Sequence, residues 1–140
     1  MSSIADNIGS VTRRIQKATL QAGRAPGSVH LLAVSKTRPP EDLREAFAAG
    51  QRAFGENYLQ EALKKIEALS GLDGLEWHFI GPIQSNKTRQ MASAFAWVHS
   101  VDRLKIARRL SEQRDPALPP LNICLQVNIN EEESKSGCTL

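Results

Sequence analysis

Lys36 follows a short apolar stretch and precedes two prolines, which makes it the first candidate for chemistry in the chain. Residues 29–34 are mostly apolar or small, and the chain then turns polar through Ser35, Lys36 and Thr37. Such a run predicts a strand buried on both faces, here over about residues 29–36, and the prolines are suited to opening a helix. We therefore expect Lys36 at the exit of a buried strand.

A lysine in this place has two interpretations. In the first, it is an ordinary solvated cation in a loop. In the second, its surroundings partly remove it from water, so that the neutral amine is available to form a Schiff base with an aldehyde. The residues next to Lys36 do not decide between the two.

Three further polar residues within or after predicted strands are open to a similar choice. Asn57, with Glu56 before it, is either a turn or cap residue or an amide that binds a ligand oxygen. His78 alternates with aromatic residues and is either a satisfied interior histidine or part of a ligand wall. Lys135 lies in residues 134–137, which form either a solvated loop or one that holds an anion through backbone amides and the lysine.

Other kinds of chemistry find little support in the composition. The net charge is +3, and the basic residues are scattered among acidic ones rather than gathered with aromatics. The two cysteines and three histidines form no disulfide framework or metal signature, and no Gly-x-Ser-x-Gly nucleophile turn occurs. We see no signal-like leader and no apolar run of membrane length. We expect a cytoplasmic, metal-free protein that binds neither nucleic acid nor membrane.

Helices and strands are expected to alternate along the chain. A stripe that begins with Ile4 and Ile8 predicts a first helix over about residues 2–24. The predicted strands lie at about 29–36, 52–55, 76–80, 97–101 and 121–130. The helices between them lie at about 39–49, 59–69, 86–95 and 103–114.

Details of two connections can also be predicted. Ser85 or Asn86 is expected to cap the fourth helix, and Asp102 to cap the fifth. The third helix is expected to bury one apolar stripe, made of Leu59, Leu63, Ile66 and Leu69.

Five strands joined by short helical connections indicate an α/β fold with parallel strands and right-handed crossovers. An open doubly wound sheet and a (β/α)8 barrel both begin in this way. No Gly-rich phosphate loop follows the first strand, which disfavours the nucleotide-binding open sheet. In a barrel the polar carboxyl ends of all five strands would converge on one face, where such folds keep their chemistry.

Four motifs stand out along the chain, at residues 31–37, 54–58, 77–87 and 134–137. In this order they resemble the pyridoxal phosphate homeostasis proteins of the YggS/PROSC type, close to their bacterial members, and the resemblance covers essentially all 140 residues. The resemblance implies a (β/α)8 TIM-type barrel like the amino-terminal domain of alanine racemase. Residues 1–140 would be the amino-terminal portion of that single domain, with about five strands.

The resemblance also implies a function and a set of site residues. Lys36 is expected to hold pyridoxal 5′-phosphate as a Schiff base, while the motifs of Asn57 and His78 line the cofactor pocket and Lys135 makes a secondary cofactor or phosphate contact. The protein would bind the cofactor without catalysis and hand it over, with pyridoxal-phosphate-dependent apo-enzymes as candidate partners. The alternative is a pyridoxal-phosphate-dependent enzyme such as an amino-acid racemase. That enzyme would need a second acid/base residue, and none is evident here.

The chain departs from this family in length. Family members are considerably longer, and their later strands carry the phosphate-binding loops and the residue that faces the pyridine nitrogen. Five strands cannot close a barrel, so the edges of the first and fifth strands are expected to lack partners. We expect the chain either to self-associate through those edges or to need the remaining strands, and to bind the cofactor weakly alone.

Overall fold

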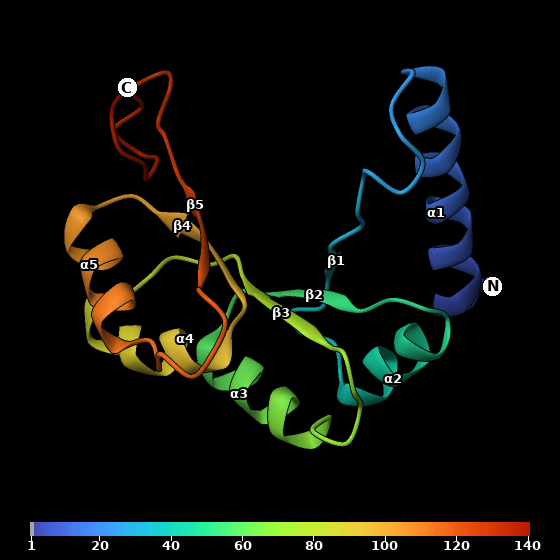
Figure 1. Ribbon diagram of the computed structural model, residues 1–140, viewed down its shortest axis with the longest axis horizontal. Coiled ribbons are helices and arrows are strands. Elements are labelled where there is room, and N and C mark those ends of the chain that lie inside the picture. The colour runs from blue at the N-terminus through green and yellow to red at the C-terminus, as the bar shows by residue number, and fades with distance from the viewer. Residues whose placement is uncertain (1) are drawn as a thin grey trace.

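Five parallel strands form one sheet in which every strand pairs with its neighbours in sequence (Figure 1). The computed structural model describes residues 2–140. The strands are β1 (Ala33–Val34), β2 (Ala53–Glu56), β3 (Glu76–Phe79), β4 (Trp97–Val101) and β5 (Asn122–Leu125). A doubly wound sheet reverses its strand order at a switch point, whereas a barrel keeps it. The order β1-β2-β3-β4-β5 therefore confirms the α/β class and the arc of a barrel.

The helices lie on the outer side of this arc. Four of them follow strands β1 to β4 and cover the outer face of the sheet in Figure 1, whereas α1 (Ile4–Gln21) stands beside β1. The four are α2 (Pro40–Ala48), α3 (Leu59–Ala68), α4 (Thr88–Ala94), which follows the short 3-10 turn η1 (Ser85–Lys87), and α5 (Leu104–Gln113).

The hydrophobic core lies between the sheet and these helices. Side chains alternate between the faces of a strand, so every second residue of β2, β3 and β4 points outward into the core. The largest fully buried apolar side chains are Phe54, Phe79, Phe95, Leu69, Met91, Ile106, Leu110, Val98 and Val101. The opposite, concave face carries the remaining strand residues, and it is the face that a closed barrel turns inward.

The two outermost strands are shorter than predicted. The sequence predicted strands over 29–36 and 121–130, but β1 has two residues and β5 has four. Within residues 2–140 each of them pairs with a neighbouring strand on one side only. Each therefore has backbone hydrogen bonds to one partner strand instead of two, and fewer of its residues are assigned to a strand. The prediction of burial on both faces is also wrong, since Val34 is 54% exposed on the concave face.

The predicted helix caps at Ser85, Asn86 and Asp102 are wrong. The turn η1 precedes α4, which begins at Thr88, and neither α4 nor α5 has a side-chain cap. The Thr88 hydroxyl donates to the Ser85 carbonyl at 3.1 Å, so the bond runs opposite to a cap. Asp102 lies instead 3.5 Å from the Arg103 guanidinium.

The apolar stripe predicted for α3 is only partly right. The structure buries Leu59, Ala62, Lys65 and Leu69, while Leu63 and Ile66 are half-buried. A charged residue therefore occupies the buried face of this helix.

Within residues 2–140, no helix combines the length and apolarity needed to cross a bilayer. In the same residues, no three potential metal-ligating side chains gather.

Candidate functional site

Lys36 lies just beyond β1, at the carboxyl edge of the sheet. The Ser35 amide still pairs with β2, donating to the Gly55 carbonyl at 2.9 Å. The Ser35 side chain is buried on the helix side, so alternation puts Lys36 on the concave side, as for Val34. Lys36 is exposed to solvent within the described residues, and the structure keeps its amine accessible.

The backbone around Lys36 forms a tight turn. The Arg38 amide donates to the Ser35 carbonyl at 3.1 Å, which makes Lys36 and Thr37 the two central residues. Thr37 has φ of 64°, in the left-handed region that β-branched residues avoid. A positive φ at the third position alone is typical of a type II turn, where glycine is the usual residue.

An ionic cluster, made of the buried Glu56 and Lys65 and the half-exposed Glu61, lies on the helix side of this turn. The Lys65 ammonium, at the middle of α3, is 3.0 Å from each oxygen of Glu56 and 2.8 Å from Glu61 Oε1. It also donates to the Ser35 carbonyl at 2.7 Å, and the Ser35 hydroxyl donates to Glu56. Glu61 in turn accepts from the Thr37 amide at 2.6 Å.

Hydrogen bonding keeps Glu61 in its charged form. The hydrogen bond from Lys65 lowers the pKa of the Glu61 carboxyl, desolvation opposes this, and the bond from the Thr37 amide lowers it further. At neutral pH the acceptor that holds the Thr37 amide is therefore a carboxylate.

Asn57 lies beside Lys36 at the end of the next strand. Val34 is in register with Gly55, so Lys36 and Asn57, each two residues further along the chain, stand at the same level of the sheet. A Cβ placed on Gly81 would lie 2.3 Å from the Asn57 carbonyl oxygen, so the loops after β2 and β3 touch through their backbones. Asn57 also borders a hollow of about 460 Å³ between these two loops.

His78 lies on the concave face, one layer below Lys36, because it is in register with Gly55. Its ring stacks on Trp97 with an interplanar angle of 2°. Its Nε2 is 2.6 Å from Glu76 Oε1, and its Nδ1 is 2.8 Å from His99 Nε2. A carboxylate only accepts hydrogen bonds. When both imidazole rings are neutral, His78 therefore donates from Nε2 to Glu76 and accepts at Nδ1 from His99. Burial lowers the pKa of His99, and the neighbouring His78 lowers it further.

Lys135 lies apart from these residues. It belongs to the segment after β5, which bends back so that Val127 and Cys138 form an isolated bridge. Figure 1 shows this segment at the far end of the row of strands from β1. Lys135 is exposed, and within residues 2–140 its side chain forms no hydrogen bond or ion pair. The structure therefore brings Lys36, Asn57 and His78 into adjacent positions and leaves Lys135 outside that group.

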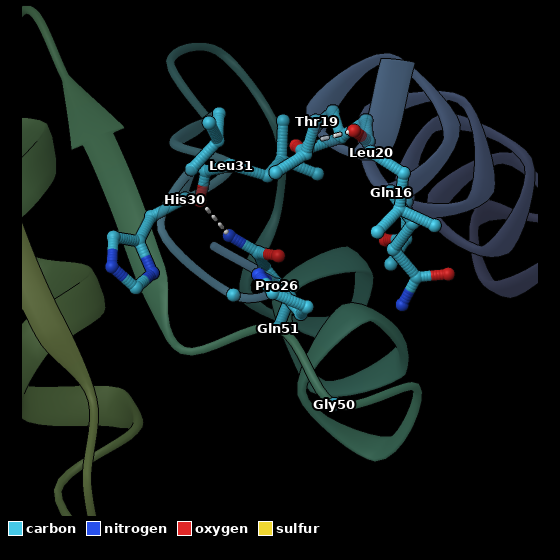
Figure 2. A pocket seen from close by; sticks show the side chains of 12 residues that line it. Gln16, Thr19, Leu20, Pro26, His30, Leu31, Gly50 and Gln51 are labelled. Atoms are coloured by element: carbon cyan, nitrogen blue, oxygen red, sulfur yellow. Dashed lines mark hydrogen bonds between the residues drawn. The ribbon is translucent and has the colours of Figure 1, made fainter. Parts of the chain in front are cut away.

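A second hollow lies at the opposite end of β1 (Figure 2). It measures about 490 Å³ and is lined by α1 and the residues before β1 and β2, among them Gln16, His30 and Gln51. The Gln51 amide donates to the Leu31 carbonyl at 2.7 Å across it. Residues 29–31 precede β1 whereas Lys36 follows it, so this hollow is not part of the site.

The residues missed by sequence reasoning are Ser35, Glu61 and Lys65. Glu61 and Lys65 are spaced as an ordinary surface ion pair on a helix, which hides their role. The available signal was the position of Lys65 in line with Leu59, Ala62 and Leu69, on the face that packs against the sheet.

The donor set at this edge fits the aldehyde end of pyridoxal 5′-phosphate. An accessible primary amine stands at a strand end, its backbone is held, and an amide side chain stands at the same level of the neighbouring strand. A primary amine condenses with an aldehyde once it is unprotonated. This is the chemistry that the arrangement around Lys36 can perform.

Sequence relatives extend over the entire chain. No protein-family model matches it. A protein of Pseudomonas aeruginosa is 67% identical over 138 residues, covering 99% of this chain and 60% of the relative. A protein of Escherichia coli K12 is 53% identical over 142 residues, covering 100% of this chain and 61% of the relative. Both are named pyridoxal phosphate homeostasis protein, and this chain spans about 60% of their length.

Solved structures show the same fold. PipY of Synechococcus elongatus PCC7942, with pyridoxal phosphate bound, matches with a TM-score of 0.70 and 45% identity, over 81% of this chain and 53% of PipY. A structure described as an unknown protein from Bifidobacterium adolescentis matches with a TM-score of 0.84 and 36% identity, over 96% of this chain and 58% of its own. Both matches cover only part of the longer chain.

Proposed function

Because this chain belongs to the pyridoxal phosphate homeostasis protein family, with relatives 49–67% identical, we propose that it binds pyridoxal 5′-phosphate through a Schiff base on Lys36. The observation that carries the proposal is the accessible Lys36 amine at the carboxyl edge of the sheet. The bound cofactor in PipY, a 45%-identical structure, supports the choice of ligand.

Lys36 supplies the amine in this linkage. When bound, the cofactor offers an aldehyde. The unprotonated nitrogen of Lys36 forms a bond to the aldehyde carbon, the nitrogen loses its two protons, and the aldehyde oxygen leaves as water. The chain thereby holds the cofactor reversibly, because water reverses the same step.

The proposed role is binding and transfer of the cofactor rather than turnover. A racemase needs a second acid/base group across the cofactor. Both ring nitrogens of His78 are already bonded, to Glu76 and His99, which favours a role in the pocket wall over proton transfer. The proposed recipients are cytoplasmic apo-enzymes that require the cofactor.

The other proposed contacts differ in how directly the geometry supports them. Asn57 stands level with Lys36, and His78 lies one layer deeper on the same face. Lys135 remains a proposed secondary or phosphate contact on its motif alone.

The test is to reduce the protein with borohydride in the presence of pyridoxal 5′-phosphate and map the adduct by mass spectrometry. The samples are wild type, Lys36→Ala and the matched control Lys64→Ala, an exposed lysine of α3. Each is made as the 140-residue chain and as an extended chain, joined to the part of the P. aeruginosa relative that the match does not cover. Labelling on Lys36 that only Lys36→Ala removes is the expected result. Labelling scattered over many lysines in both lengths would overturn the proposal.

An assay of alanine racemisation on the extended chain tests the non-catalytic role. No conversion above the rate of free cofactor is expected. Conversion that depends on Lys36 would establish the racemase alternative instead.

We also propose that the 140-residue chain self-associates through the edges of β1 and β5. Each has one partner strand within residues 2–140, and on β5 Ile123 and Leu125 are 41% and 67% exposed. An unpaired edge with apolar side chains is a template for pairing with another chain. Light scattering is expected to show dimers or larger species that Leu125→Lys reduces. A monodisperse monomer that unfolds cooperatively would contradict this.

A further inference from the structure

Glu56 and Lys65 are the two charged side chains, histidine aside, that are buried in residues 2–140. Glu56 is 0% exposed and Lys65 is 3% exposed, inside the apolar layer between the sheet and α3. Removing charges from water is costly, and apolar residues of similar size often serve stability as well as a buried ion pair. The ionic cluster is therefore not explained by packing of the core alone.

The bonds of the ionic cluster end on the backbone on both sides of Lys36. Lys65 donates to the carbonyl of Ser35, the residue before it, at 2.7 Å. Glu61 accepts from the amide of Thr37, the residue after it, at 2.6 Å. Lys65 joins the two carboxylates, so one connected network holds both neighbours of the lysine.

The held conformation is one that the chain does not adopt unaided. Thr37 has φ of 64°, and a threonine persists there only where its surroundings determine the backbone. The carboxylate of Glu61 bonds the amide of this same residue, which ties the unusual turn to α3. Beyond β3, by contrast, the bonds at the strand end are neutral: the Ser100 hydroxyl donates to the Ile80 carbonyl, and the Ile80 amide donates to the Glu56 carbonyl.

We propose that the ionic cluster positions Lys36: it fixes the backbone before and after this residue, so that the amine reaches the aldehyde from the concave face in one orientation. Glu61 and Lys65 are positioning residues because they bond the backbone of the neighbours of Lys36. Glu56 is a positioning residue because it holds Lys65 and accepts from the Ser35 hydroxyl. This inference rests on the proposed function, because it assigns these residues a task in the Schiff base on Lys36.

The first measurement is independent of the cofactor. Amide hydrogen exchange at Thr37 is expected to be slowed in wild type and to speed up about 10-fold or more in Glu61→Ala, because a hydrogen bond to a charged acceptor is lost. Glu61→Gln is expected to restore part of the protection, since its amide oxygen can accept the same bond. The matched control is Glu67→Ala, an exposed glutamate of the same helix whose side chain makes no hydrogen bond in residues 2–140.

The second measurement uses pyridoxal 5′-phosphate on the extended chain. The induced circular dichroism of the bound cofactor reports its fixed orientation, and titration gives its dissociation constant. Glu61→Ala and the double variant Glu56→Leu/Lys65→Met are expected to lose most of the dichroism and to bind about 10-fold more weakly, while borohydride still labels Lys36. Lys64→Met and Glu67→Ala are expected to match wild type. The double variant removes both buried charges together, so no buried charge stays unpaired and we expect the fold to be retained. Glu61 also loses Lys65, but its side chain is 29% exposed and can be solvated.

The outcomes separate the two proposals. An adduct on Lys36 in every variant, with unchanged dichroism and affinity, would overturn the positioning role and leave the proposed function intact. An unprotected Thr37 amide in wild type would overturn it as well. A wild-type extended chain with no adduct on Lys36 would overturn the proposed function, and with it the task assigned to the ionic cluster.

Discussion

The stretches that follow β1 and β5 each contain a lysine predicted to contact the cofactor and one non-glycine residue with positive φ. Thr37 has φ of 64° and Glu131 has φ of 53°. The turn at Thr37 is held by two side chains of α3, the half-exposed Glu61 and the buried Lys65. The turn at Glu131 is held from within its own segment, where Asn128 bonds the backbone of Glu132 at 2.7 and 3.2 Å.

The two turns have the same kind of backbone but are stabilised differently. The turn at Thr37 is stabilised by tertiary contacts, and the turn at Glu131 by local contacts within its own loop. A residue in such a conformation costs about 1–3 kcal/mol, which its surroundings must offset. Around Lys36 the offset comes from the side chains of Glu61 and Lys65 in α3, so changes in α3 reach the end of β1. Around Lys135 it comes from an exposed loop, so only changes within that loop matter.

The largest contrast is expected between the two lysines themselves. Lys36→Ala is expected to abolish the mapped adduct, because the covalent anchor is gone. Lys135→Ala is expected to weaken cofactor binding by no more than about 10-fold, as for an exposed charge worth about 1 kcal/mol. Titration of the extended chain with pyridoxal 5′-phosphate measures both. A loss as complete in Lys135→Ala as in Lys36→Ala would erase the distinction between the two stretches.

The free energy of unfolding should show how strongly the ion pair of Glu56 and Lys65, which supports the first stretch, contributes to the core. Lys65→Met is expected to lower the free energy of unfolding by about 3–5 kcal/mol, because it leaves Glu56 buried and unpaired. The double variant Glu56→Leu/Lys65→Met is expected to recover most of that loss. The control Lys64→Met should stay within about 0.5 kcal/mol of wild type. Urea unfolding measures these values, and a single variant as stable as the control would show that the pair is not buried in solution.

The segment after β5 should respond only locally. Asn128→Ala removes bonds to the backbone of Glu132 and Lys135 and is expected to cost about 1 kcal/mol or less at this exposed site. Hydrogen exchange should become faster in residues 131–138 and stay unchanged at Thr37. Faster exchange at Thr37 would mean that the two stretches are coupled after all.

The smallest expected effect is the pH dependence of the Glu61 contribution. Its folded pKa lies below the usual 4.5, chiefly because Lys65 bonds the charged form. The contribution is therefore complete above pH 4.5 and is lost as the pH falls through the lower folded pKa. The stability difference between wild type and Glu61→Gln should be constant near neutral pH and shrink in acid, as measured by urea unfolding at a series of pH values. A difference that grows in acid would contradict this sign. Glu67→Gln is the matched control.

The sequence predicted the order of elements well because its strands are short and clearly bounded. β4 occupies Trp97–Val101, the predicted range, since a helix ends before it and Asp102 follows. The two outer strands were predicted too long, because apolar alternation does not reveal that a strand lacks a partner on one side.

The site was predictable where it depends on a strand end and not where it depends on packing. Lys36 follows the strand as expected, because the apolar run and the prolines mark that point. Lys65 was not predicted, since a lysine four residues after a glutamate normally marks a solvated helix face. Its burial depends on Glu56 ending β2 on the helix side, which only the packing of α3 on the sheet determines.

The sequential strand order also bears on how the chain is made. Each strand after β1 pairs with the one synthesised just before it, so the sheet can grow one unit at a time as the chain leaves the ribosome, without waiting for distant segments. The turn at Lys36 and the ionic cluster that holds it are complete once residue 65 has emerged. The turn that carries Lys36 can thus take shape during translation, before β3 and the later strands have left the ribosome.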